Sequence, residues 1–289
     1  MEKISKSIKR TSTMTNSQND ETYIGKDGIK YCSKCHTKRE TNETVPFFNK
    51  RMPIPCKCMQ EAEQQAKERE EYSKKMQMLD RLRSASLLGK RYQQTTFENT
   101  DTTIGGEFIK AYNRCRKYCQ EADTALENGY GVYIYGNPGS GKTHLTACIC
   151  NELISQYRQC LFTNFFEISK LIRSTWGRTN TDAESVIRRI GEIDFLFIDD
   201  LGTEALQKNG EDNWLQEQIF DIINKRYNNL KPTIFSSNHS LNELIEKRGM
   251  LEKTVDRIGE MSTVYIKVDS ESYRAKKRSD INFKRGNII

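Results

Sequence analysis

Eight consecutive residues, which read GNPGSGKT, decide the fold of this chain: Gly136, Asn137, Pro138, Gly139, Ser140, Gly141, Lys142 and Thr143. They match the pattern G-x-x-x-x-G-K-[ST] in full, between a strand-like run at 131–135 and a helix-like run at 143–154. Glycines in such a loop let the backbone approach a ligand closely, and the N–H groups of the loop face phosphates at a helix N-terminus. The sequence therefore predicts an ATP site, with Lys142 on the β- and γ-phosphates and the Thr143 hydroxyl on Mg²⁺.

Two acidic residues close a second strand-like run, predicted at 194–199. Four apolar residues at 195–198 precede Asp199 and Asp200, as in a buried strand that delivers a carboxylate to a phosphate site. We expect Asp199 to hold Mg²⁺ together with Thr143, and Asp200 to orient and activate the attacking water. The alternative interpretation is a polar turn after a core strand.

A third strand-like run, at 232–238, ends on the neutral amide of Asn238. If this strand lies between the other two, Asn238 faces the γ-phosphate and helps to place the water. Taken alone, an asparagine after a strand is usually a turn former, so this assignment depends on the fold.

From about residue 90, short apolar runs alternate with helical stretches. The predicted strands lie at 131–135, 159–165, 194–199, 232–238 and 264–268, and amphipathic helices such as 213–230 fit between them. Strands that alternate with helices favour a parallel sheet covered on both faces. We therefore predict an α/β fold, with a P-loop parallel sheet flanked by helices.

Four of the nine cysteines cluster near the N-terminus: Cys32, Cys35, Cys56 and Cys58. Two thiolate pairs in a short segment with few apolar residues suit a closed tetrahedral Zn²⁺ site, which would supply the folding energy that a small core lacks. The second pair is C-x-C, not the commoner C-x-x-C, and the adjacent His36 is an alternative ligand. Unligated cysteines and an iron–sulfur cluster are the competing interpretations. The other five cysteines are expected to be small buried residues.

The composition divides the chain into five predicted segments: a disordered tail at 1–22, a zinc-binding module at 23–60, a linker helix at 61–89, an ATPase domain at 90–275 and a basic C-terminal tail at 276–289. The net charge of +7 permits a polyanionic partner without requiring one. No stretch approaches the roughly 20 apolar residues of a membrane helix, and the N-terminus lacks the apolar core of a signal peptide. We therefore expect a cytoplasmic protein with no membrane partner.

Five segments occur in an order that resembles a known family: GNPGSGKTHL, FLFIDDLGTE, TIFSSN, DRI and ESYR. Over roughly residues 90–275 the chain resembles the DnaC- and DnaI-like helicase loaders of the AAA+ ATPases, which are close to the IstB-like transposition ATPases. The resemblance places Lys142 and Thr143 at the Walker A positions, Asp199 and Asp200 at the Walker B positions and Asn238 at sensor 1. Many AAA+ proteins have Glu where Asp200 stands, so the resemblance implies slow hydrolysis, stimulated by DNA or a partner.

The resemblance also assigns two arginines. Arg257 matches the region that supplies an arginine finger to the neighbouring subunit, and Arg274 matches sensor 2. If Arg257 acts in trans, the working enzyme is an ATP-dependent homo-oligomer. Either arginine could instead be a surface salt-bridge partner.

The function that the resemblance implies is the ATP-dependent loading of a hexameric, DnaB-like replicative helicase onto single-stranded DNA. It also implies that the zinc module contacts the helicase and that the helix at 168–178 lines the DNA path, with Lys170, Arg173, Trp176 and Arg178. An ordinary solvated helix is the alternative for that segment. A transposition ATPase and a nucleotide-gated adaptor with negligible hydrolysis are the alternative functions.

Overall fold

The computed structural model describes residues 22–47, 49–174, 180–203 and 210–270. The chain divides into two compact units, Met1–Lys75 and Met76–Ile289. Because the predicted tails at 1–22 and 276–289 lie almost entirely outside the described residues, their disorder stays a prediction.

The N-terminal unit contains two small antiparallel sheets. Strand β1 (Thr22–Ile24) pairs with β2 (Lys30–Cys32), and β3 (Glu40–Val45) pairs with β4 (Lys50–Pro53). Of this unit's residues in the described range, Ile29, Cys32 and Cys56 are the buried apolar ones. So small a core needs a further source of stability, such as a metal.

Helix α1 (Lys57–Ala85) runs from the first unit into the second. It covers most of the linker helix predicted at 61–89, but it ends at Ala85. None of its residues is buried, and ion pairs four residues apart recur along it, at Lys57–Glu61, Glu63–Lys67 and Glu70–Lys74. Pairs of this spacing stabilise an exposed helix weakly. Near its end, Leu79 and Leu82 pack on the core of the C-terminal unit.

The C-terminal unit is built on a five-stranded parallel sheet with the order β6-β7-β8-β5-β9. All five strands predicted from the sequence are present: β5 (Gly131–Gly136), β6 (Cys160–Thr163), β7 (Phe195–Leu201), β8 (Thr233–Ser237) and β9 (Ser262–Val268). Strand β6 is shorter than expected because the Asn164 side chain accepts the Glu167 N–H and begins a helix there.

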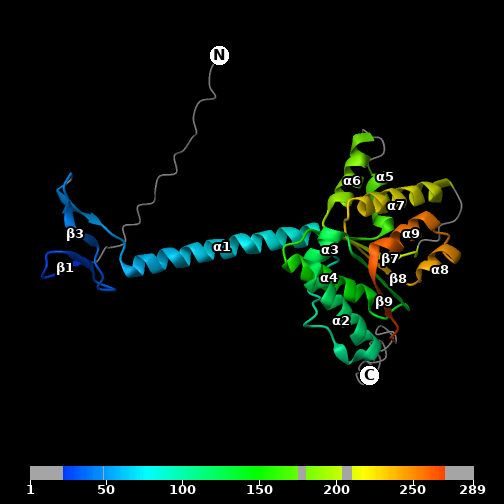
Figure 1. Ribbon diagram of the computed structural model, residues 1–289, viewed down its shortest axis with the longest axis horizontal. Helices are drawn as coiled ribbons and strands as arrows, with labels where there is room; N and C mark the ends of the chain where they lie inside the picture. Colours follow the sequence, from blue (N-terminus) through cyan, green and yellow to red (C-terminus); the bar gives the residue numbers. More distant parts are fainter. Residues whose placement is uncertain (1–21, 48, 175–179, 204–209, 271–289) are drawn as a thin grey trace, which may run out of the picture. The chain divides into compact units, whose positions relative to one another are not determined.

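Helices cover both faces of this sheet (Figure 1). Along β5, Val132 and Ile134 pack against α2 (Gly106–Gln120), α3 (Ala122–Asn128) and α4 (Lys142–Ser155). Tyr133 points to the other face. Within the described residues, the helices on that face are α5 (Phe165–Arg173), α6 (Asn180–Glu192), α7 (Gly210–Asn228), α8 (Leu241–Glu246) and α9 (Glu252–Met261). The alternation of side chains along the central strands therefore builds two separate cores, as expected for a sheet covered on both faces.

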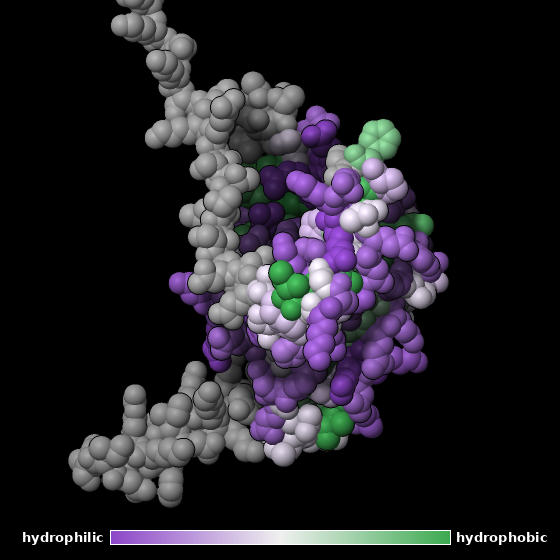
Figure 2. All heavy atoms as spheres, turned by 90° about the vertical axis from the view of Figure 1, so that its left-hand side faces the viewer, coloured by the Kyte–Doolittle hydropathy of each residue, from purple (hydrophilic) through white to green (hydrophobic). Residues whose placement is uncertain are grey.

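The five cysteines outside the N-terminal cluster are all buried, as predicted: Cys115, Cys119, Cys148, Cys150 and Cys160. Figure 2 shows a face on which hydrophilic side chains dominate and hydrophobic ones are scattered. In the part of the chain that the structure describes, no helix is both long and apolar enough to cross a membrane.

Candidate nucleotide site and metal centre

The phosphate loop joins the end of β5 to the start of α4. Gly136 and Gly141 have φ values of 149° and 103°, and a Cβ on Gly136 would collide with the carbonyl oxygen of Val268. Gly141 is the N-cap of α4, so the first backbone N–H groups of that helix have no partner within the helix and can bind an anion at the loop. Lys142 is 5% exposed, and its Nζ donates to the carbonyl oxygens of Gly136 and Asn137, both at 2.9 Å. The loop thus forms an anion cradle with its cation already positioned.

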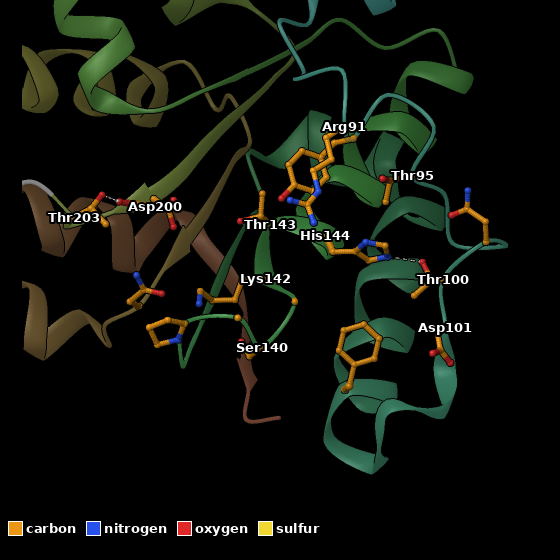
Figure 3. Close-up of a pocket in the computed structure, with 17 residues that line it drawn as sticks. Arg91, Thr95, Thr100, Asp101, Ser140, Lys142, Thr143, His144, Asp200 and Thr203 are labelled. Carbon is orange, nitrogen blue, oxygen red and sulfur yellow. Dashed lines mark hydrogen bonds between the residues drawn. The ribbon is translucent and has the colours of Figure 1, made fainter. Parts of the chain in front are cut away.

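The loop forms one wall of a cavity of about 390 Å³. The other residues that line it come from α2, from α4, from the ends of β7 and β8 or just after them, and from the segment at 89–101 (Figure 3). Asp200 and Asn238 line this cavity together with Lys142 and Thr143. Strand β8 lies between β5 and β7, which is the condition on which the role of Asn238 depended.

The first acid, Asp199, lies beside the phosphate loop. Its Oδ1 accepts the Thr143 hydroxyl at 3.2 Å and also accepts the hydroxyl of Ser236, on β8. Burial raises the pKa of Asp199, whereas the Ser236 hydrogen bond acts in the opposite direction. A carboxylate and a hydroxyl are hard oxygen donors that suit Mg²⁺, and a cation between them would favour the charged form of this carboxyl.

The second acid, Asp200, has a left-handed backbone with φ 55°. Such a conformation costs about 1 kcal/mol or more, although aspartate tolerates it better than most residues. Thr203 stabilises this turn, because its N–H donates to the Asp200 carbonyl at 3.1 Å and its hydroxyl contacts the same oxygen. The turn presents Asp200 to the cavity (Figure 3).

The segment at 89–101 forms the wall opposite the phosphate loop, and sequence reasoning missed it. Its residues in the cavity wall are Arg91, Tyr92, Thr95, Asn99, Thr100 and Asp101. The Asn151 side chain of α4 donates to the carbonyls of Tyr92 and Thr95, at 2.8 and 2.7 Å. The His144 ring, whose pKa burial lowers, shares a 2.8 Å hydrogen bond with Thr100 (Figure 3). The segment has no periodic pattern, so only its tertiary contacts reveal it.

Of the two predicted arginines, only Arg257 falls within the described residues. Arg257, on α9, lies 3.1 Å from Glu260 and stacks over the Tyr227 ring at 4.5 Å. It is not among the residues that line the cavity. Arg274 lies outside the described residues.

Helix α5 carries two of the residues predicted to contact DNA. Lys170 pairs with Glu167 at 3.2 Å and lies 4.2 Å from the centre of the Phe166 ring, and Arg173 stacks over Trp214. Phe166 is 54% exposed. The helix ends at Arg173, before the predicted limit of 178, and Trp176 and Arg178 fall outside the described residues.

The four N-terminal cysteines converge as predicted. Their sulfur atoms all lie within 4.8 Å of one another, with Cys32–Cys58 at 3.6 Å and Cys56–Cys58 at 3.3 Å. A disulfide needs about 2.05 Å, whereas Zn–S bonds of about 2.3 Å in a tetrahedron place sulfurs about 3.8 Å apart. Hydrogen bonds with the neighbouring thiols raise the pKa of Cys58 to about 12, so a cation would be needed to hold this sulfur as a thiolate. The arrangement therefore suits Zn²⁺.

His36 does not belong to this cluster. Its Nδ1 lies 3.3 Å from the Tyr23 hydroxyl, and the four ligand atoms that converge are all sulfurs. Arg39 adds a hydrogen bond to the cluster, because its guanidinium donates to the sulfur of Cys56 at 3.4 Å.

Known proteins resemble the chain over most of its length. The Escherichia coli K12 protein "Replicative helicase loader DnaC" is 27% identical over 212 residues, which cover 73% of this chain and 80% of that protein. The Bacillus subtilis phage-like element PBSX protein XkdC is 30% identical over 192 residues, or 64% of this chain and 68% of that protein.

Solved structures and a family profile agree with these relatives. A crystal structure of the DnaC helicase loader superposes with a TM-score of 0.51 and 25% identity, and covers 62% of this chain and 99% of that one. The fold is thus that of P-loop AAA+ proteins, as predicted. The profile of the IstB-like ATP binding proteins matches residues 63–281. With its phosphate loop, paired acids and strand order in place, this chain belongs to the family of IstB-like ATP-binding proteins.

Proposed function

We propose that this protein loads a hexameric, DnaB-like replicative helicase onto single-stranded DNA in an ATP-dependent reaction. The observation that carries the proposal is the match to a replicative helicase loader along 80% of that relative's length. The match includes the phosphate loop and both acids, so it covers the residues that would bind and use the nucleotide.

The geometry of the cavity supports ATP hydrolysis as the chemical step. Lys142 and the N–H groups at the start of α4 would hold the phosphates, while Asp200 would accept a proton from the attacking water and Asn238 would orient that water. Thr143 and Asp199 would hold Mg²⁺, which neutralises charge on the β- and γ-phosphates. Lys142, Thr143, Asp200 and Asn238 line one cavity, and Asp199 accepts the Thr143 hydroxyl at 3.2 Å, so the five side chains already lie together.

The placement of Arg257 supports a site shared between subunits. This arginine lies on α9, outside the cavity wall of its own chain, and a finger that acts on a neighbour needs such a place. We therefore propose an ATP-dependent homo-oligomer in which Arg257 completes the adjacent site. For Arg274 the sensor-2 role stays a proposal that rests on the family resemblance.

Helix α5 supports a nucleic-acid contact. Phe166 and Lys170 lie one helical turn apart, and the exposed ring stacks beneath the ammonium group. An exposed aromatic beside cations suits base stacking combined with phosphate contact. We propose that α5, with Lys170 and Arg173, lines the path of single-stranded DNA.

The zinc module is proposed as the docking surface for the helicase. Several large apolar side chains of this unit are exposed, including Ile24 at 71% and Phe47 at 96%. Exposed apolar side chains on a small metal-binding module are typical of a surface that contacts another protein.

Two alternatives each have an observation in their favour. The family profile is that of IstB-like ATP-binding proteins, which favours a transposition ATPase acting on duplex DNA. The short side chain of Asp200 favours a nucleotide-gated adaptor that binds ATP with negligible turnover.

A pull-down from native host lysate separates these functions. Immobilised protein with ATP is expected to recover the replicative helicase, and the Lys142→Ala variant is expected to recover less of it. Recovery of a transposase in place of the helicase would favour the transposition ATPase. Phosphate release that stays at background with and without single-stranded DNA would favour the adaptor.

A further inference from the structure

Ser236 is a fully buried polar residue in β8, the strand between the phosphate loop's own strand and the strand that carries the two acids. We propose that Ser236 is a positioning residue whose single hydroxyl sets the geometry of both Asp199 and Asp200. The inference rests on the proposed ATPase function, since it concerns the groups that would hold Mg²⁺ and activate water.

The Ser236 hydroxyl makes one hydrogen bond to each acid. Its Oγ donates to Oδ1 of Asp199, and it accepts the backbone N–H of Asp200 at 3.1 Å. A hydroxyl offers one hydrogen and two lone pairs, so one group can satisfy both contacts at once. Because Ser236 is 0% exposed, its hydroxyl is shielded from water on its own side of both bonds.

These contacts occur where the pairing of β7 with β8 is irregular. Ile198 pairs with Phe235 and Leu201 pairs with Ser237, so three steps along β7 match two along β8. The extra residue is a β-bulge, and bulges re-aim side chains next to active sites. Asp200 takes its left-handed conformation within this bulge. The Ser236 hydroxyl therefore binds the N–H of the residue that the bulge turns toward the cavity.

The contact with Asp199 selects one oxygen of its carboxylate. Oδ1 accepts the hydroxyls of both Ser236 and Thr143, and Oδ2 takes neither of these bonds. The side chain of Asp199 is thus oriented from two sides, by β8 and by α4, before any ligand arrives. A carboxylate held in this way binds a metal ion more tightly than a carboxylate that is free to rotate.

Ser237 offers a matched control in the same strand. It is also 0% exposed, but its hydroxyl donates to the carbonyl of Leu201 at 2.7 Å and accepts the N–H of His239 at 3.0 Å. Removing this hydroxyl costs one buried and one part-buried hydrogen bond without touching either carboxylate. A general loss of stability should therefore appear in both serine variants, whereas a loss of positioning should appear only at Ser236.

The test measures how strongly the complete protein binds a fluorescent ATP analogue as Mg²⁺ is added. In Ser236→Ala we expect unchanged affinity in EDTA and about a tenfold rise in the Mg²⁺ concentration for half-maximal binding, as expected for one lost hydrogen bond to a charged group. Ser236→Thr keeps the hydroxyl, so its Mg²⁺ concentration for half-maximal binding is expected to lie close to that of the unmodified protein. For Ser237→Ala we expect a value within about twofold of the unmodified protein, a smaller change than the loss of a hydrogen bond to a charged group would cause.

Two results would overturn the proposal: a half-maximal Mg²⁺ concentration in Ser236→Ala equal to that of the unmodified protein, or an equal rise in Ser237→Ala. Failure of the proposed nucleotide site is a different result, because the unmodified protein would then bind the analogue weakly at every Mg²⁺ concentration. Failure of hydrolysis alone would appear as phosphate release at background from an unmodified protein that binds the analogue normally.

Discussion

Lys142 shows how a residue can be prepared for a ligand by the backbone around it. Its ammonium group is held by two carbonyl oxygens of the phosphate loop, and almost none of the side chain is exposed. Bonds of this kind keep the cation at the cavity wall, where it can exchange its carbonyl partners for phosphate oxygens. Side chains that are positioned in advance lose less entropy when the ligand binds.

Replacing Lys142 with alanine removes this cation, and ATP affinity is expected to fall about 100-fold or more because a charge-assisted bond to the phosphates is removed. Titration with a fluorescent ATP analogue measures the change, and circular dichroism checks that the variant is folded. Lys117→Ala on α2, an exposed lysine paired with Glu121, is the control and should bind as the unmodified protein does. A folded Lys142→Ala variant with normal ATP affinity would remove this site.

The two acids should separate binding from turnover. Asp200→Asn is expected to keep ATP and Mg²⁺ binding but to lower phosphate release about 100-fold, because a neutral amide cannot serve as a base. Asp199→Asn is expected to weaken Mg²⁺ binding directly. Phosphate release measures turnover in both variants, and titration with Mg²⁺ measures how strongly each one binds the metal. Wild-type turnover in Asp200→Asn would show that the roles assigned to the two acids are wrong.

At the scale of elements, the sheet order brings the site together. The loop after β5, the acids at the end of β7 and the amide after β8 are far apart in the sequence, but three neighbouring parallel strands carry them to one edge. Ligand sites of open α/β sheets lie at this carboxyl edge. Arg226, a buried arginine on α7, donates to the carbonyls of Ile193 and Pro232, which lie just before β7 and β8. These bonds hold the beginnings of the two strands together.

Local patterns were enough to predict the central strands, the phosphate loop and the two acids. Runs of apolar residues that end in Gly or Asp carry that information in a few adjacent positions. The segment at 89–101 and Ser236 could not be predicted, since their roles come from hydrogen bonds to α4 and β7, many residues away. The length of β6 also depended on a cap, that of Asn164, which competed successfully with strand propensity.

Helix α5 should contribute to DNA affinity through its charges. Changing Lys170 and Arg173 to alanine is expected to weaken binding of single-stranded DNA and to reduce the slope of log affinity against log salt by about 0.7 for each phosphate that the protein no longer neutralises. Fluorescence anisotropy at several salt concentrations measures both quantities. The control removes two charges elsewhere, at Lys110 and Lys117 on α2. If the two double variants behave alike, α5 is an ordinary solvated helix.

The zinc module should fold or unfold independently of the nucleotide site. We expect one zinc per chain, and Cys32→Ser with Cys35→Ser should release it and unfold residues 23–60, because metal binding supplies most of this module's folding free energy. Metal analysis and proteolysis report these changes. Cys119→Ala, at a buried cysteine outside the cluster, should keep its zinc. Protein purified without chelator and found to contain no zinc would contradict the assignment.

At the scale of the whole molecule, the chain joins two compact units, and each contains one of the two candidate sites. The nucleotide site lies wholly within Met76–Ile289 and the cysteine cluster within Met1–Lys75. We therefore expect the double cysteine variant to bind ATP normally while its binding to the helicase falls sharply. Helicase binding that survives the loss of zinc would move the docking surface elsewhere, to the linker helix first.

A closed circle of single-stranded DNA tests most directly whether this protein uses ATP to place a helicase ring on DNA. A hexameric ring cannot thread onto a circle that has no end, so helicase recovered on the circle has been opened and loaded. We predict that the protein with ATP raises the recovered helicase severalfold over helicase alone, and that Lys142→Ala does not. Equal recovery with and without the protein, in a preparation that binds both ATP and the helicase, would contradict the account.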